Sequence, residues 1–264
     1  MFTFLYIFRA EVKRYFTVQW SHVGDNLSWF AYTFFMFAAI VVILNGVSGG
    51  DLGGKEQLLI MVGWITWIVA GDCMMEIPAE VSNEAETGTL EQLCLNPVPL
   101  SLVLALRSVA YFLGVGAKGV IAAVVLIFFI TPLSFLPALF ILFFLSLIGA
   151  YGMGYMFGGI AMVFKRVSAL TNLVFSLMIF LTGAFVGLES FGWVFHALRF
   201  LLPLTWGISL MRSTLVGEAT LFSLIQSGEL FYLALHSLVY LALGLTIFIL
   251  GYRRARIKGT LAHY

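Results

Sequence analysis

Six runs of about 20 apolar residues most constrain what this chain can fold into. A helix needs about 20 apolar residues to cross a hydrocarbon core of about 30 Å. Hydrophobic residues make up 61% of the 264 residues and charged residues only 10%, against about 25% charged in a soluble domain. We therefore expect an all-α integral membrane protein with six transmembrane helices: Asn26–Leu44, Leu58–Met75, Ser108–Ile130, Pro137–Phe164, Ala169–Leu188 and Leu230–Gly251.

The rest of the composition narrows the organisation to one domain. No stretch is polar enough to form a separate soluble domain, so residues 1–264 are expected to be a single transmembrane domain. The net charge of +1 argues against nucleic acid as a partner. The two cysteines, Cys73 and Cys94, do not suit a disulfide framework. Arg9 and Glu11 interrupt the first apolar run, which excludes a cleavable signal peptide.

The basic residues predict the orientation, because cytoplasmic loops carry an excess of lysine and arginine. If both termini lie in the cytoplasm, only Lys55, Arg199 and Arg212 lie on the outer side. The inner side then holds Arg9, Lys13, Arg14, Arg107, Lys165, Arg166, Arg253, Arg254, Arg256 and Lys258. We expect a multi-pass protein of the cytoplasmic (inner) membrane with both termini inside.

Two further segments are apolar without being spans. Residues 1–22 place aromatic and aliphatic side chains at helical spacing with basic residues between them, which is typical of a helix lying in the inner interface. The alternative is a cytoplasmic extension of the first span. Residues 189–229 are apolar but broken by Pro203 and several glycines, which predicts short re-entrant helices in the last outer loop.

A polar, acidic island occupies the inner loop predicted at residues 78–100. Gly88 is suited to end one helix, and Thr89 to start another with Gln92 as its capping-box partner. The short helix that follows has an apolar side and an acidic side, and we expect Glu84, Glu86 and Glu91 to stay in water. The alternative is a solvated loop that only joins two spans.

This island, Glu84-Ala-Glu-Thr-Gly-Thr-Leu-Glu-Gln-Leu93, followed by Asn96-Pro97, resembles the signature loop of type-2 ABC exporter permeases. The similarity extends over essentially the whole chain and includes the segment Leu202–Arg212 before the last span. Ala85 and Thr87 stand where the family usually has basic residues. The resemblance implies a cytoplasmic coupling helix that rests on a separate ATPase subunit through Glu84, Glu86, Gly88, Thr89, Leu90, Glu91, Gln92 and Leu93.

The resemblance also implies an assembly of two permeases, identical or different, with two copies of an ABC ATPase that bind ATP and magnesium. This chain itself is expected to bind no cofactor and to have no catalytic residues. The segment Gly49–Glu56 matches the spacing of a P-loop, but Glu56 replaces the serine or threonine that would hold magnesium. No metal site is expected either, because neither His196 nor His236 has a second ligand at a suitable spacing.

Charged and small residues inside the spans offer further candidates. Lys118 lies near the middle of the third span and either faces the translocation path or pairs with Asp72 of the second span. Ala150, Gly154 and Gly158 recur every four residues, as do Gly183 and Gly187. Such spacing marks helix packing within one subunit or, alternatively, an interface between two permeases.

In the outer segment, five residues form a candidate outer gate: Trp193, His196, Arg199, Pro203 and Trp206. The alternative is that these aromatic side chains anchor the segment at the membrane surface, where tryptophan is enriched.

With 26 phenylalanines and 10 methionines, a cavity would have large and adaptable apolar walls. We therefore expect a permease subunit that exports hydrophobic or amphipathic compounds such as drugs, antibiotics or lipids. One alternative is a permease for lipid-linked polysaccharide. An alternative of another class is an ATP-independent channel or secondary transporter.

Overall fold

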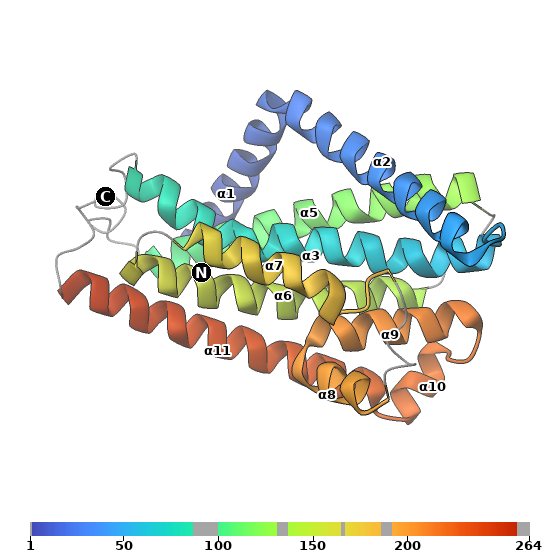
Figure 1. Cartoon of the computed structure of the whole chain (residues 1–264). Helices are drawn as coiled ribbons and strands as arrows, with labels where there is room; N and C mark the ends of the chain where they lie inside the picture. The colour runs from blue at the N-terminus through green and yellow to red at the C-terminus, as the bar shows by residue number, and fades with distance from the viewer. Residues whose placement is uncertain (1, 87–99, 131–136, 165–166, 186–191, 258–264) are drawn as a thin grey trace.

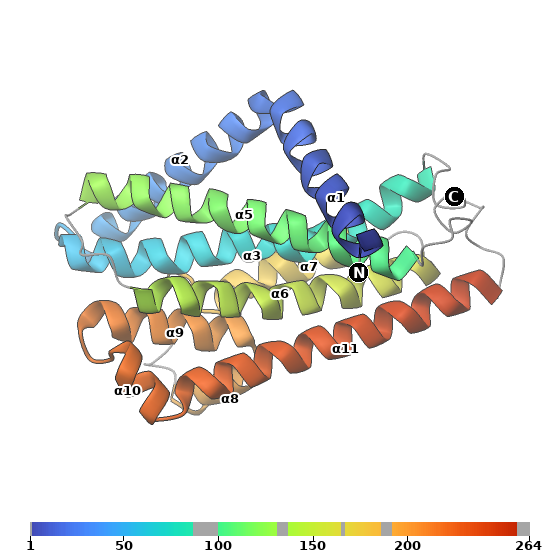
Figure 2. The ribbon, with the colours of Figure 1, turned by 180° about the vertical axis from the view of Figure 1, so that it is seen from behind.

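The computed structural model describes residues 2–86, 100–130, 137–164, 167–185 and 192–257, and all its regular elements there are helices. Several long helices run side by side along one axis (Figures 1 and 2). The helices are α1 (Phe2–Ser21), α2 (Val23–Ser48), α3 (Gly54–Glu86), α5 (Leu100–Ile130), α6 (Pro137–Phe164), α7 (Ser168–Leu181), α8 (Trp193–Leu201), α9 (Pro203–Val216), α10 (Leu221–Gln226) and α11 (Glu229–Ile257).

Five of the six predicted spans correspond to helices that are long and apolar enough to cross a membrane. The predicted span Ala169–Leu188 is not confirmed as a full span. It contains α7, whose 14 residues reach only about 21 Å. The helix ends at Thr182, and Gly183 then adopts the left-handed conformation with φ +67°. The turn is also held from outside the helix, because Arg212 on α9 donates a hydrogen bond to the carbonyl of Ala184.

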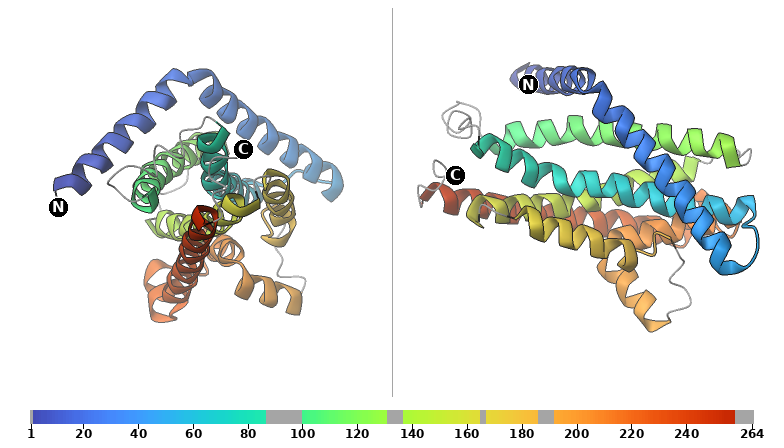
Figure 3. Two further views of the ribbon diagram at one scale, coloured as in Figure 1. Left: turned by 90° about the vertical axis from the view of Figure 1, so that its left-hand side faces the viewer. Right: turned by 45° about the horizontal axis from the view of Figure 1, so that its top comes forward.

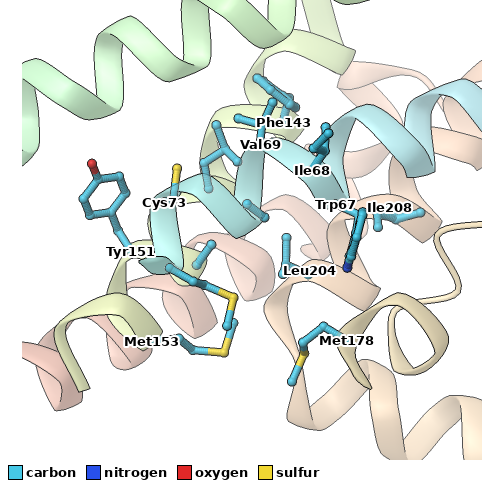
Figure 4. Packing of buried hydrophobic residues seen from close by; sticks show 14 of the residues in the cluster. Trp67, Ile68, Val69, Cys73, Phe143, Tyr151, Met153, Met178, Leu204 and Ile208 are labelled. Atoms are coloured by element: carbon cyan, nitrogen blue, oxygen red, sulfur yellow. The ribbon is translucent and has the colours of Figure 1, made fainter. Parts of the chain in front are cut away.

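The core is built around α3 and α6. In the apolar window of α3, 83% of the residues are buried, against 11% in α2, so α3 is the central helix and α2 a peripheral one. Figure 4 shows Trp67, Ile68, Val69 and Cys73 of α3 among side chains of α6 and α9. The indole of Trp67 stacks on Phe175 of α7 with ring centroids 4.3 Å apart.

Glycines let α6 approach its two neighbours closely. A side chain at Gly154 would strike the backbone of α3, and one at Gly152 would strike the backbone of α11. On α11, Gly244 and Gly251 lie directly against α6 in the same way. Gly158 is held against Ile77 of α3. The prediction that small residues of the fourth span serve packing within one subunit is confirmed for Gly154 and Gly158.

The first two helices, α1 and α2, cover one side of the bundle. Seen along the bundle axis in Figure 3, α1 and α2 meet at an angle and cover the side of α5 and α3. α1 matches the predicted helix at residues 1–22 and is not among the helices apolar enough to span. Its location in the membrane interface stays a prediction.

The segment before the last long helix contains three short helices, α8, α9 and α10. α8 projects from the side of the bundle (Figure 3), whereas α9 is packed inside it. Arg212 ties α9 to α3 as well as to the turn after α7, because its guanidinium also donates to the carbonyl of Leu59 on α3 at 3.2 Å. The short lengths agree with re-entrant helices, and their insertion into the membrane stays a prediction.

The predicted inner loop at residues 78–100 begins and ends in helix. α3 continues through Pro78 to Glu86, and α5 starts at Leu100. The end of α3, the start of α5 and the last turn of α11 lie at the same end of the bundle (Figure 1). Residues 88–93 of the predicted coupling helix lie outside the described residues.

Candidate functional site

Arg107 on α5 is the centre of an ion-pair network beside the predicted coupling loop. Its guanidinium donates to carboxylates of two residues on α3, reaching Glu84 at 2.9 Å and also Glu80. The same guanidinium donates to Glu11 on α1 at 3.1 Å. One arginine therefore joins three helices, two of which flank the predicted coupling loop.

A second arginine strengthens the connection to α1. Arg14 lies 3.1 Å from the Glu80 carboxylate and 3.5 Å from that of Glu11. The Arg14 side chain is 44% exposed, whereas that of Arg107 is 12% exposed. Solvent screens exposed pairs strongly, so Arg107 carries most of the electrostatic attraction in this network.

The network corrects one expectation about the predicted coupling residues. Glu84 was expected to stay in water, but its side chain is only 13% exposed and pairs with Arg107. The expectation failed because Arg107 lies 23 residues away in the sequence, and helix packing brings the two together. The side chain of Glu86 and all of Gly88–Leu93 lie outside the described part of the chain, so their coupling role stays a prediction.

The network is the inner end of an acidic stripe on α3. Asp72, Glu76, Glu80 and Glu84 follow one another at four-residue intervals, which places them on one face of a helix. Ionisable residues inside membrane spans are rare and mark functional sites by default. The stripe faces α5, α1 and the start of α2, and these helices supply the partners of its carboxylates.

Asp72 and Glu76, the two acids of the stripe farther from the ion-pair network, have hydrogen-bond donors but no close cation among the described residues. Trp29 on α2 donates its indole N–H to Asp72 at 3.0 Å, and Tyr111 on α5 hydrogen-bonds Glu76. Lys118 interacts electrostatically with Asp72. Among the described residues, however, no ion pair of 4.0 Å or less joins them. Both interpretations of Lys118, a pair with Asp72 or a side chain facing the translocation path, therefore stay predictions.

Tyr15 packs α1 against α5 beside the acidic stripe. We call the stripe and the facing surfaces of α5, α1, α6 and the start of α2 the seam. Its phenol fills the space left by Gly114 on α5, where a side chain would collide with the ring, and meets Tyr111 edge-on at 5.8 Å. Burial raises the pKa of Tyr15 to about 12, and the nearby charges of Glu76 and Asp72 add to the shift. The hydroxyl therefore keeps its proton at physiological pH and stays a donor beside the two acids.

A hydroxyl on α6 completes the inner surface of the seam. Tyr151 is 4% exposed, and its hydroxyl has no hydrogen-bond partner among the described residues. It interacts electrostatically with Glu76 and Tyr111, and in Figure 4 it points away from Met153. By contrast, Tyr155 one turn along donates to Ser108 on α5 at 3.0 Å. Buried polar groups without a partner are uncommon, and each calls for a specific explanation.

An apolar cavity lies farther along the same helices. Its volume is about 320 Å³, and α3, α5, α6 and Met211 of α9 form its walls. Its lining includes Ile65 and Thr66 on α3, Gly119 on α5 and Phe140 on α6. Ile65 and Glu80 are 15 residues apart, so the cavity lies about 22 Å along α3 from the ion-pair network.

The five residues of the predicted outer gate lie on α8 and α9. Trp206 on α9 donates to Glu229 on α11 at 2.7 Å and stacks on Tyr232. Pro203 is buried against Gly149, and a side chain added at Gly149 would collide with the Pro203 ring. Trp193 on α8 is 79% exposed. His196 and Arg199 lie on α8, and their side chains are outside the described set, so the gate stays a prediction.

Within the described ranges, no group of three histidine, cysteine or acidic side chains is arranged to hold a metal ion. Cys73 is buried in the core of α3.

Several residues of the seam were not singled out as site residues from the sequence. They are Glu11, Arg14, Tyr15, Glu80, Arg107, Tyr111 and Tyr151. The four-residue spacing of the acids on α3 was a usable signal for the stripe itself. The pairing of that stripe with α5 and α1 could not be predicted from the sequence, because it depends on contacts between helices.

Comparison with known proteins supplies the family. The search of curated proteins gave no match, and neither did the search of solved structures. The model of the ABC-2 type transporter family matches residues 6–216, from α1 through α9. This range includes every residue of the seam and most of the cavity-lining helices. The chain therefore belongs to the ABC-2 type transporter family and is the membrane-spanning subunit of an ABC transporter.

Proposed function

We propose that this permease exports hydrophobic or amphipathic compounds across the cytoplasmic membrane, driven by ATP hydrolysis on a partner. Family membership implies an ABC ATPase subunit as that partner. In the proposed assembly, two permeases work with two ATPases, which bind the ATP and magnesium. The segment Glu84–Leu95 rests on the ATPase, and both termini lie in the cytoplasm.

The observation that carries the coupling proposal is the position of Arg107. It pairs with Glu84 at the last described turns of α3 and with Glu11 on α1. A push on the loop between α3 and α5 therefore moves α1 with them as one body. Transmission of nucleotide-driven closure requires such a rigid connection, because packed elements shift as units between discrete arrangements.

The composition and the volume of the cavity support the export of apolar cargo. The cavity walls are aliphatic and aromatic apart from Thr66, which is the composition typical of small-molecule sites. Its volume of about 320 Å³ suffices for part of a drug-sized molecule.

Site-directed cross-linking tests the coupling proposal. Leu93→Cys and Glu91→Cys, each in the otherwise functional permease, are expected to form a disulfide or maleimide bridge to the co-expressed ATPase. The bridge should form more readily in one nucleotide state than in the other, because the loop moves with the ATPase. Lys55→Cys, at the opposite end of α3, serves as the control and should not cross-link.

Two other functions make different predictions. A lipid-linked glycan permease would show ATP hydrolysis stimulated by the glycan and not by apolar drugs. An ATP-independent channel or secondary transporter would give no ATPase cross-link at Leu93 or Glu91, and would move cargo in vesicles that contain the permease alone.

A further inference from the structure

The face of α3 that points at α5 changes character along its length. Ile65, Asp72 and Glu76 fall within about 40° of one another on a helix of 3.6 residues per turn. The part near Ile65 and Thr66 borders the apolar cavity, and the part at Asp72 and Glu76 borders the polar seam. Asp72 is six residues from Thr66, about 9 Å along the helix axis. One face thus combines an apolar compartment and an acidic one.

The acidic compartment contains more carboxyl groups than basic side chains. The seam brings together five carboxyl groups and three basic side chains: Glu11, Asp72, Glu76, Glu80 and Glu84 with Arg14, Arg107 and Lys118. Both arginines form ion pairs at the inner end, with Glu11, Glu80 or Glu84. Asp72 and Glu76 have no ion pair of 4.0 Å or less among the described residues. Carboxylates inside a membrane are costly unless they are paired or hydrated.

A second, independent feature points to a ligand at the same place. The Tyr151 hydroxyl is buried on α6 and has no partner in the described part of the chain, and Glu76 and Tyr111 are among the groups that interact with it electrostatically. The indole of Trp29 and the ring of Tyr111 border the two acids. Aromatic faces attract cations, and a hydroxyl oxygen accepts a hydrogen bond from an ammonium group.

We infer that Asp72 and Glu76 receive the positively charged group of an amphipathic cargo whose apolar part occupies the cavity beside Thr66. This inference rests on the proposed function and specifies its cargo as cationic amphiphiles. Val69 of α3 and Phe143 of α6 pack against Gly119, where α5 approaches α3. In this inference, movement of α5 away from α3 at Gly119 opens a path between the acids and the cavity.

A matched pair of fluorescent probes tests the inference without the ATPase. Diphenylhexatriene is neutral, and its trimethylammonium derivative carries a permanent positive charge on the same apolar body. The full permease in nanodiscs is titrated with each probe, and saturable energy transfer from tryptophan is measured against empty nanodiscs. The cationic probe is expected to bind about 10-fold more tightly than the neutral one, which corresponds to about 1.4 kcal/mol.

Variants assign the two compartments. Asp72→Asn and Glu76→Gln are expected to remove the 10-fold preference for the cationic probe and to leave binding of the neutral probe unchanged. Glu56→Gln, an exposed acid at the other end of α3, is the control and should change neither. Val124→Trp fills the cavity from its exposed rim and should weaken both probes. Ile121→Trp, exposed on the same helix and outside the cavity, should weaken neither.

Two results would overturn the inference. Equal affinity of the wild-type protein for both probes would mean that the cavity takes apolar chains alone. An unchanged preference in Asp72→Asn and Glu76→Gln, with neutral-probe binding intact, would mean that the cation binds elsewhere. Neither result touches the ATPase cross-link at Leu93, so failure here is distinguishable from failure of the proposed function.

Discussion

Arg107 on α5 donates a hydrogen bond of 2.9 Å to Glu84 on α3, across the two helices that flank the predicted coupling loop. The same guanidinium reaches Glu11 on α1. The pairing connects α1 and two spans at the end of the bundle where a partner ATPase is proposed to act.

Replacement of Arg107 should destabilise the protein and uncouple it. Arg107→Gln leaves three partly buried carboxylates without their shared cation, and loss of one partner of a buried pair costs about 3 kcal/mol. Thermal unfolding followed by tryptophan fluorescence in detergent measures the loss. Arg253→Gln, an exposed arginine near the end of α11, should unfold like the wild type. Equal stability of both variants would contradict the central role of Arg107.

Arg14 should matter less, although it contacts the same carboxylates. Its side chain is 44% exposed, and exposed ion pairs contribute about 0–1 kcal/mol. Arg14→Gln is therefore expected to lower the free energy of unfolding by less than a third of the loss caused by Arg107→Gln. The same fluorescence assay compares them, and a larger loss for Arg14→Gln would reverse the assignment of the central arginine.

Gly114→Ala should weaken the docking of α1 on α5. The new methyl group would collide with the ring of Tyr15, and overpacking of this kind costs about 1–3 kcal/mol. In a Tyr15→Ala background the collision disappears, and alanine should then be neutral or stabilising because it is the better helix former. A double-mutant cycle on unfolding free energies measures the difference. Additive effects would show that the Tyr15 ring does not fill the space beside Gly114.

Gly152→Ala should separate α6 from α11. The added methyl group would meet the backbone at Tyr240 and Leu241, which cannot move without shifting the whole helix. We expect destabilisation of about 1–3 kcal/mol. The matched control is Gly46→Ala, because Gly46 on α2 has open space around its α-carbon. That variant should gain up to about 1 kcal/mol from helix propensity, and a loss there would contradict the packing argument.

Much of the fold follows from hydropathy and charge. The apolar runs predict five helices that the structure contains, and the inner-loop motif predicts the family. The predicted span Ala169–Leu188 is not confirmed as a full span, because α7 ends at Leu181 and a contact from another helix holds the turn that follows. Arg212 holds the carbonyl of Ala184 from 28 residues away, and no local pattern reveals that bond.

The candidate site was less accessible from the sequence. Averaged hydropathy conceals the acids of α3, although the four-residue spacing from Asp72 to Glu84 is visible when the helix face is drawn. Their partners could not be predicted, since Arg107, Tyr111 and Tyr15 come from two other helices. Lys118 was singled out from the sequence, but among the described residues no ion pair of 4.0 Å or less joins it to Asp72, so its role stays a prediction.

The most direct test is the number of cargo molecules moved per ATP hydrolysed, measured in liposomes that contain the permease and its ATPase. The wild-type complex should transport only with ATP, and Arg107→Gln should hydrolyse ATP while its transport per ATP falls severalfold. Arg253→Gln should keep the wild-type ratio. Uphill transport by the permease alone, or a wild-type ratio in an assembled Arg107→Gln complex, would contradict the account.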